Sequence, residues 1–127
     1  MPAVFSAYAT IATILLSLEE FLAADAMLDS IMPQVLECED VSLNARCFEV
    51  LGDAQVGIAG GERGEARSRR LRKAVDFVER AEREWERMGD RRGGRRCVGR
   101  KARIEEFVGE RGGRDRAVER FRMLERQ

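Results

Sequence analysis

Apolar residues recur along this chain at the three- and four-residue spacing of α-helices. In residues 20–36 one stripe repeats at these intervals and consists of Phe21, Ala24, Leu28, Ile31 and Val35. Such a stripe predicts an amphipathic helix with one buried face. Pro33 lies inside the pattern, so we expect it to kink or shorten the end of this helix.

The same spacing predicts further helices and no strands. The most regular helix begins at Ala66 or Leu71 and ends near Met88, and we expect its Trp85 to lie in the core between helices. Its apolar face consists of Leu71, Ala74, Val75, Val78, Ala81, Trp85 and Met88. No segment alternates with a period of two, so the predicted class is all-α. The other predicted helices cover about 3–16, 43–58, 92–108 and 114–126, which makes about six in all.

The first predicted helix is apolar around its whole circumference. Residues 3–18 carry no charge, yet they are too few for the roughly 20 residues that span a bilayer. A helix of this kind needs neighbours on both sides, which suggests that the chain is a piece of a longer protein. No glycine marks a turn after Leu16, so a single long helix from Ala3 remains an alternative. We expect its exposed side to bind a partner through Phe5, Tyr8, Ile11 and Leu15.

The helices also repeat in pairs. Three of them share a small–large–small or aliphatic pattern that steps by four and then three: Ala23, Met27, Ser30; Ala74, Val78, Ala81; and Ala117, Phe121, Leu124. Phe48, Leu51 and Gly52 match the W-x2-L-G opening of a tetratricopeptide repeat. We therefore predict an α-solenoid of stacked hairpins at about 3–36, 43–88 and 92–126, with a mobile loop at about 60–70. A generic helical bundle with coincidental spacing is the alternative.

Charge divides the chain into two halves. Residues 1–60 hold nine acidic residues and one basic residue, whereas residues 61–127 hold 14 acidic and 22 basic residues. The totals balance at 23 each, so the whole chain has no net attraction to nucleic acid. The densest basic cluster consists of Arg91, Arg92, Arg95, Arg96 and Arg100. We interpret it as a solvated helix face or as a contact to an acidic protein partner.

No residue pattern indicates catalysis. The chain has no histidine, which excludes a Ser-His-Asp triad and every histidine-containing metal site. Three cysteines, Cys38, Cys47 and Cys97, are too far apart for a CxxC motif and suggest a reduced compartment inside the cell. Adjacent acidic residues such as Glu105 and Glu106 point about 100° apart on a helix and cannot share a substrate. We expect no catalytic, cofactor-binding or metal-binding residue, and thus no enzyme.

Several segments resemble the C-terminal tetratricopeptide-repeat region of anaphase-promoting complex subunit 5. They are Phe21 to Asp25, Ile31 to Leu36, Ser42 to Phe48, Ala74 to Asp90, Lys101 to Ile104 and Arg114 to Leu124. The richness in glycine and arginine fits a fungal member of that family. Gly93, Gly94 and Gly99 depart from the family pattern and predict an unstable fifth helix.

This resemblance implies a non-catalytic scaffold segment. It would pack against other subunits of the anaphase-promoting complex, a cullin–RING ubiquitin ligase that controls the cell cycle, with earlier repeats missing at the N-terminal side. Its partners would be protein subunits rather than nucleic acid, membrane or a small-molecule substrate. Its location would be intracellular, nuclear or cytoplasmic. The alternative function is a free-standing tetratricopeptide adaptor that binds an acidic peptide or protein.

Overall fold

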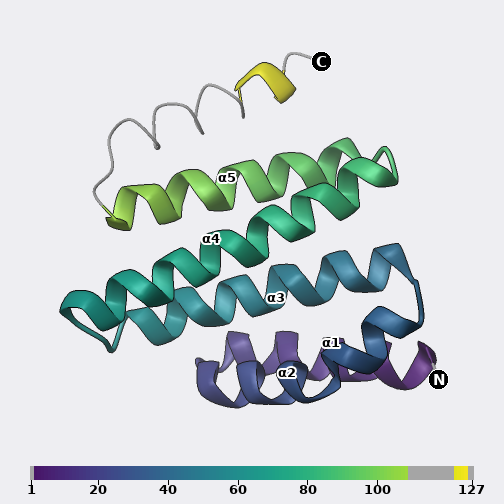
Figure 1. Cartoon of the computed structure of the whole chain (residues 1–127), viewed down its shortest axis with the longest axis horizontal. Helices are drawn as coiled ribbons and strands as arrows, with labels where there is room; N and C mark the ends of the chain where they lie inside the picture. The colour runs from purple at the N-terminus through teal and green to yellow at the C-terminus, as the bar shows by residue number, and fades with distance from the viewer. Residues whose placement is uncertain (1, 109–121, 126–127) are drawn as a thin grey trace.

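The computed structural model describes residues 2–108 and 122–125 (Figure 1), and every regular element among them is an α-helix. The all-α prediction is therefore confirmed. Residues 122–125 are helical too, whereas the rest of the helix predicted over 114–126 lies outside the described residues. The five helices are α1 (Pro2–Ser17), α2 (Phe21–Glu37), α3 (Val41–Ala59), α4 (Gly64–Arg87) and α5 (Arg91–Val108).

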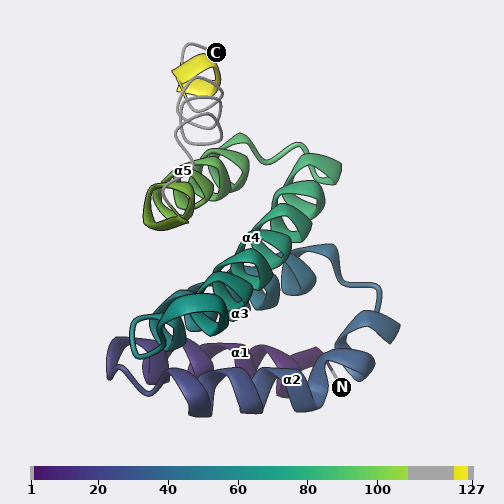
Figure 2. The same ribbon diagram turned by 60° about the vertical axis from the view of Figure 1, so that its left-hand side comes forward.

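The helices are stacked in the order of the chain. Each packs against the next, and α1 also packs against α3. Figure 1 shows α1 and α2 together at one end of the stack, α3 and α4 in the middle, and α5 at the other end, and Figure 2 shows the same order from another side. This succession of antiparallel neighbours is consistent with a helical-repeat solenoid.

Three of the connections between these helices are three-residue turns of one type. The middle residue has a positive φ in each: 60° at Glu19, 55° at Glu39 and 72° at Gly89. After α4 the Gly89 amide donates to the Glu86 carbonyl and the Asp90 amide donates to the Trp85 carbonyl, which is the Schellman pattern. The turn at Glu19 also shows that α1 and α2 are two helices, although no glycine separates them.

Two of the helices have an aspartate as their N-cap residue. The Asp40 carboxylate accepts a hydrogen bond of 3.0 Å from the Leu43 amide at the start of α3, and that of Asp90 accepts one of 2.9 Å from the Gly93 amide at the start of α5. These N-caps satisfy amide groups that have no partner within the helix. Helices α3 and α5 therefore begin by the same device.

Two local expectations are wrong. The chain is helical from Gly64, so the predicted mobile loop at 60–70 reduces to the connection of residues 60–63. Helices α3 and α4 are correspondingly long, with 19 and 24 residues. Helix α2 also continues through Pro33 to Glu37, so of the two effects expected of this proline, a kink or a shortened helix, the shortening is wrong.

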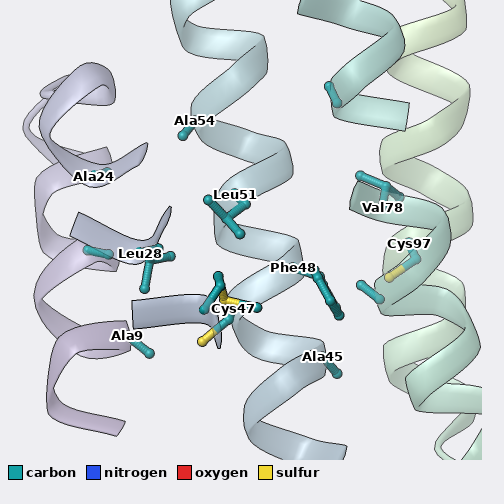
Figure 3. Packing of buried hydrophobic residues seen from close by; sticks show 14 of the residues in the cluster. Ala9, Ala24, Leu28, Ala45, Cys47, Phe48, Leu51, Ala54, Val78 and Cys97 are labelled. Atoms are coloured by element: carbon teal, nitrogen blue, oxygen red, sulfur yellow. The ribbon is translucent and has the colours of Figure 1, made fainter. Parts of the chain in front are cut away.

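The core lies on both sides of α3, and Figure 3 shows side chains from the flanking helices gathered around it. In α4 the predicted triplet Ala74, Val78 and Ala81 is buried. In α2 the predicted triplet Ala23, Met27 and Ser30 is displaced by one position from the buried face, because Ala23 and Ser30 are exposed. The stripe predicted for the same helix is right, since its members Ala24, Leu28 and Val35 are fully buried. Of the third triplet, Ala117 and Phe121 lie outside the described residues.

Close approach of α3 and α4 depends on Gly52. A Cβ atom at this position would lie 2.9 Å from Cγ2 of Val78 and 3.5 Å from the carbonyl oxygen of Ala74. Next to it Phe48 stacks on Phe77 of α4, with their ring centroids 6.3 Å apart. Phe48 and Gly52 of the predicted motif thus lie at the interface between α3 and α4.

Candidate protein-binding site

Helix α1 buries only one of its two apolar faces. Ala9 and Ala12 are buried against the neighbouring helices, and Phe5, Leu15 and Leu16 pack at the margin of the core. Because these inward residues are mostly small or half-covered, α1 uses little of its apolar surface inside the chain. The remaining apolar surface faces outward.

The outward face of α1 forms one continuous apolar surface. Val4, Tyr8, Ile11, Ile14 and Leu18 are all exposed, as is Leu22 at the start of α2. These six side chains expose between 37% and 69% of their surface. Scattered apolar residues on a protein surface are ordinary, but a contiguous patch of this kind marks an interaction site.

The spacing of these residues matches a helix-packing seam. Val4, Ala7, Ile11, Ile14 and Leu18 follow one another at intervals of three, four, three and four, which is the a and d pattern of a heptad. Leu18 stays on this path because its amide donates to the Ile14 carbonyl. Residues 2–18 carry no charged side chain. We call Val4, Ala7, Ile11, Ile14 and Leu18 the α1 seam.

The predicted partner-binding residues of this helix lie at two depths. Tyr8 and Ile11 are exposed, as we expected, whereas Phe5 and Leu15 are half-buried and pack against the core. Sequence reasoning missed Val4, Ile14 and Leu18. Their three-and-four spacing with Ile11 was the signal that could have found them.

The arginine cluster of α5 divides in a similar way. Arg100 turns toward α3, where its guanidinium donates to both carboxylate oxygens of Asp53 at 2.9 and 3.2 Å. It also pairs with Glu49 at 3.2 Å. Arg96 pairs with Glu49 at 3.5 Å and lies over the ring of Trp85. These two arginines are therefore used within the chain to hold α5 against α3 and α4.

Glu49 is the centre of this network. It is buried on α3, and its carboxylate accepts hydrogen bonds from the Trp85 indole of α4 and from the Cys97 thiol of α5. A buried carboxylate is tolerated only where several donors surround it. Glu49 meets this condition, so three helices converge on one carboxylate.

The other arginines of the cluster differ in exposure. Arg91 and Arg92 are exposed and Arg95 is half-buried. Arg92 and Arg95 line a groove of about 700 Å³ on α5, together with Arg96, Gly99, Arg100, Arg103 and Glu125. A second groove, of about 410 Å³, lies between α3 and α5 and has Val56, Ile104 and Phe107 on its walls beside Asp53, Arg100 and Arg103. Both grooves are open to solvent.

One glycine of α5 has a packing role. Gly93 is buried under the indole ring of Trp85, and a Cβ atom there would overlap the ring. Gly94, the next residue, has no atom within 4 Å of a Cβ position. The helix nevertheless continues from Arg91 to Val108 through Gly93, Gly94 and Gly99. Trp85 is buried between helices, as predicted.

The cysteines are free thiols in two environments. Cys47 and Cys97 are buried, and Cys38 is exposed. Burial raises the pKa of Cys47 to about 11. Burial and then the neighbouring Glu49 carboxylate raise the pKa of Cys97. A raised pKa keeps a thiol protonated and poorly nucleophilic, so both buried cysteines serve as core residues.

Two other kinds of site are absent from the residues that the structure describes. Within residues 2–108 and 122–125 no three His, Cys, Asp or Glu side chains are grouped as a metal ion would need. In the same part of the chain no helix combines the length and the apolarity that a membrane span requires. No protein-family model matches the chain, and a comparison with curated proteins finds no match either.

Proposed function

We propose that this chain is a non-catalytic scaffold segment that packs against another protein subunit through the outer face of α1. One observation carries this proposal: the α1 seam is continuous, uncharged and exposed. Covering it would remove five apolar side chains from water along the full length of α1. The burial of apolar surface makes the main favourable contribution to the free energy of protein association.

The contrast with α4 supports a specific role for α1. Exposed residues of α4 are mostly charged, for example Arg72, Asp76 and Glu86, so this helix has an apolar face and a solvated face. Helix α1 carries no charged side chain, and its only exposed polar side chains are the small hydroxyls of Thr10, Thr13 and Ser17. Its outer face is therefore suited to contact with protein rather than with water.

The sequence resemblance supports a finer form of the same proposal. In this form the assembly is the anaphase-promoting complex, the chain is part of its subunit 5, and its location is nuclear or cytoplasmic. The segments from Phe21 to Leu36 and from Ala74 to Asp90 carry the resemblance. The finer assignment rests on these segments, whereas the coarser one rests on the α1 seam.

Co-purification tests both levels of the proposal. The full chain, tagged and expressed in its native cell, is compared with Ile11→Lys and with the control Met88→Lys, which alters a residue of similar exposure at the end of α4. We expect one set of proteins with the wild type and the control, and its loss with Ile11→Lys. An unchanged set with Ile11→Lys would contradict the scaffold role of α1. Absence of anaphase-promoting complex subunits would contradict the finer assignment.

The adaptor alternative has less support. An acidic peptide in the groove between α3 and α5 would meet Arg100 and Arg103, and Arg100 already pairs with Glu49 and Asp53. The groove also includes the carboxylate of Asp53. Arg100 and Asp53 therefore offset each other within this groove, which favours the scaffold function over peptide binding there.

A further inference from the structure

We infer that the subunit which covers the α1 seam is a second copy of this chain, with the two α1 helices antiparallel. This inference rests on the proposed function, because it names the partner for the surface proposed above. It specifies which protein covers the seam, how the two α1 helices are oriented and which of their residues face each other. Each of these follows from a different property of the seam.

The absence of charge makes the seam compatible with itself. Positions that flank a heptad seam usually carry charges that select the partner, and like charges there would repel a second copy. Here the flanking positions on one side are Tyr8 and Leu15, and those on the other side are Ala3, Thr10 and Ser17. No charge selects a different partner and none opposes an identical one.

The shape of the seam also suits self-association. In an antiparallel pair, Ile11 can lie opposite Ile14 of the second copy and Ala7 opposite Leu18. The smallest residue of the seam then lies across from one of its largest, so no layer between the two helices pairs two small residues. The remaining residue, Val4, then meets the start of α2 in the second copy, where Leu22 is exposed.

Charges at the end of α1 favour the antiparallel orientation. The exposed Glu19 and Glu20 directly follow the helix, at the negative end of its dipole. A parallel pair would bring the four glutamates of two copies together. An antiparallel pair places each Glu19 and Glu20 beside the positive N-terminal end of the other α1, where negative charge is stabilising.

The area available is sufficient for a dimer. If a large side chain has about 150–200 Å² of surface, the six exposed apolar side chains offer roughly 500 Å² per copy. An ordinary stable interface buries about 800 Å² per partner, and about 65% of a homodimer interface is apolar. The α1 seam and its neighbours therefore supply about the apolar share that such an interface needs.

Sedimentation velocity on the purified full chain tests this inference. We expect the wild type to sediment with twice the monomer mass, and Ile11→Lys and Ile14→Glu each to sediment as monomers. An equimolar mixture of the two variants is expected to regain the dimer, because the introduced lysine of one copy then meets the introduced glutamate of the other. The control Met88→Lys is expected to remain a dimer. Circular dichroism checks that each variant keeps its helices, as expected for exposed positions.

Three results would overturn the inference: a monomeric wild type, a variant that remains dimeric, or a mixture that remains monomeric. A monomeric wild type that still captures a different protein through Ile11 would overturn the second copy as occupant and leave the proposed function standing. A dimer that depends on Ile11, together with no other protein lost in the co-purification, would support the second copy as occupant and would contradict a scaffold role of α1 toward other proteins.

Discussion

Two adjacent glycines in α5 show how much depends on a single residue. Alanine normally raises helix stability by about 1 kcal/mol relative to glycine. At Gly94 nothing occupies the space of a methyl group, so we expect Gly94→Ala to raise the free energy of unfolding by about 0.5–1 kcal/mol. At Gly93 the methyl group would overlap Trp85, and we expect Gly93→Ala to lower it by about 2 kcal/mol. Urea unfolding followed by circular dichroism measures both, and equal effects of the same sign would contradict this packing.

The turns contain strain that glycine can remove. Glu19 and Glu39 adopt positive φ, a conformation that disfavours residues with a side chain by about 1–2 kcal/mol. Glycine relieves this strain but gains entropy in the unfolded chain, so we expect Glu19→Gly and Glu39→Gly each to stabilise by about 0.5–1 kcal/mol.

The third turn provides the control for these substitutions. Gly89 already has a glycine at a positive φ, and we expect Gly89→Ala to destabilise by about 1 kcal/mol. Thermal unfolding measures the change in stability of each of the three variants. Destabilisation by both glutamate-to-glycine changes would show that these turns do not have the described backbone.

The buried thiols make stability depend on pH at the alkaline end. The pKa of Cys47 is raised from 9.0 to about 11 in the folded chain, so the folded state holds this proton more tightly than the unfolded state does. The resulting stability is fully present below pH 9 and is lost as pH rises toward 11. We expect urea unfolding at about pH 8, 9.5 and 10.5 to show this decline, and Cys47→Ala to reduce its slope. An equal slope in the variant would exclude Cys47 as a cause.

At the scale of elements, the attachment of α5 depends on one carboxylate. Glu49→Ala would leave the Trp85 indole buried without its acceptor and would remove one partner from both Arg96 and Arg100. We expect a loss of about 2–4 kcal/mol, since removal of one member of a buried charged network leaves its partners unpaired. Hydrogen exchange measured by mass spectrometry should show the largest gain in the amides of α5.

An exposed ion pair serves as the control for Glu49. Arg87 pairs with Glu84 at 3.2 Å near the end of α4, and its side chain is 65% exposed. Arg87→Ala is expected to change stability by less than about 0.5 kcal/mol, because solvent screens such pairs. If Glu49→Ala had an effect as small as this control, the network would not hold α5.

Most of each element could be predicted from apolar spacing, and the errors have physical causes. The helix bounds agree closely because stripes such as Phe21, Ala24 and Leu28 fix which face is buried. The loop at 60–70 was wrong because glycine-rich and charged sequence suggests disorder, yet α4 begins at Gly64 and its Arg70 bonds Glu62 and Gln55. The convergence on Glu49 could not be predicted, since its donors lie 36 to 51 residues away in the sequence.

At the scale of the whole molecule, the opposite charges of the two halves are partly used inside the chain. Acidic Glu49 and Asp53 of α3 pair with basic Arg96 and Arg100 of α5, so charge that looked available for a partner holds the stack together. The apolar α1, in contrast, was predicted to have an unfilled outer face from its composition alone, and the structure places that face in solvent. The structure also corrects two residues of that face, because Phe5 and Leu15 are half-buried rather than exposed.

The most direct test of the account is the accessibility of Tyr8, the only tyrosine of the chain. Tyr8 lies beside the α1 seam and is 37% exposed in the single chain. Hydroxyl-radical footprinting of the full chain, read by mass spectrometry, compares a dilute with a concentrated sample. If a second chain covers α1, oxidation of Tyr8 falls several-fold on concentration while that of Met88 stays constant. Equal oxidation of Tyr8 in both samples, together with sedimentation as a monomer in both, would contradict the claim that α1 is a surface for docking a second copy.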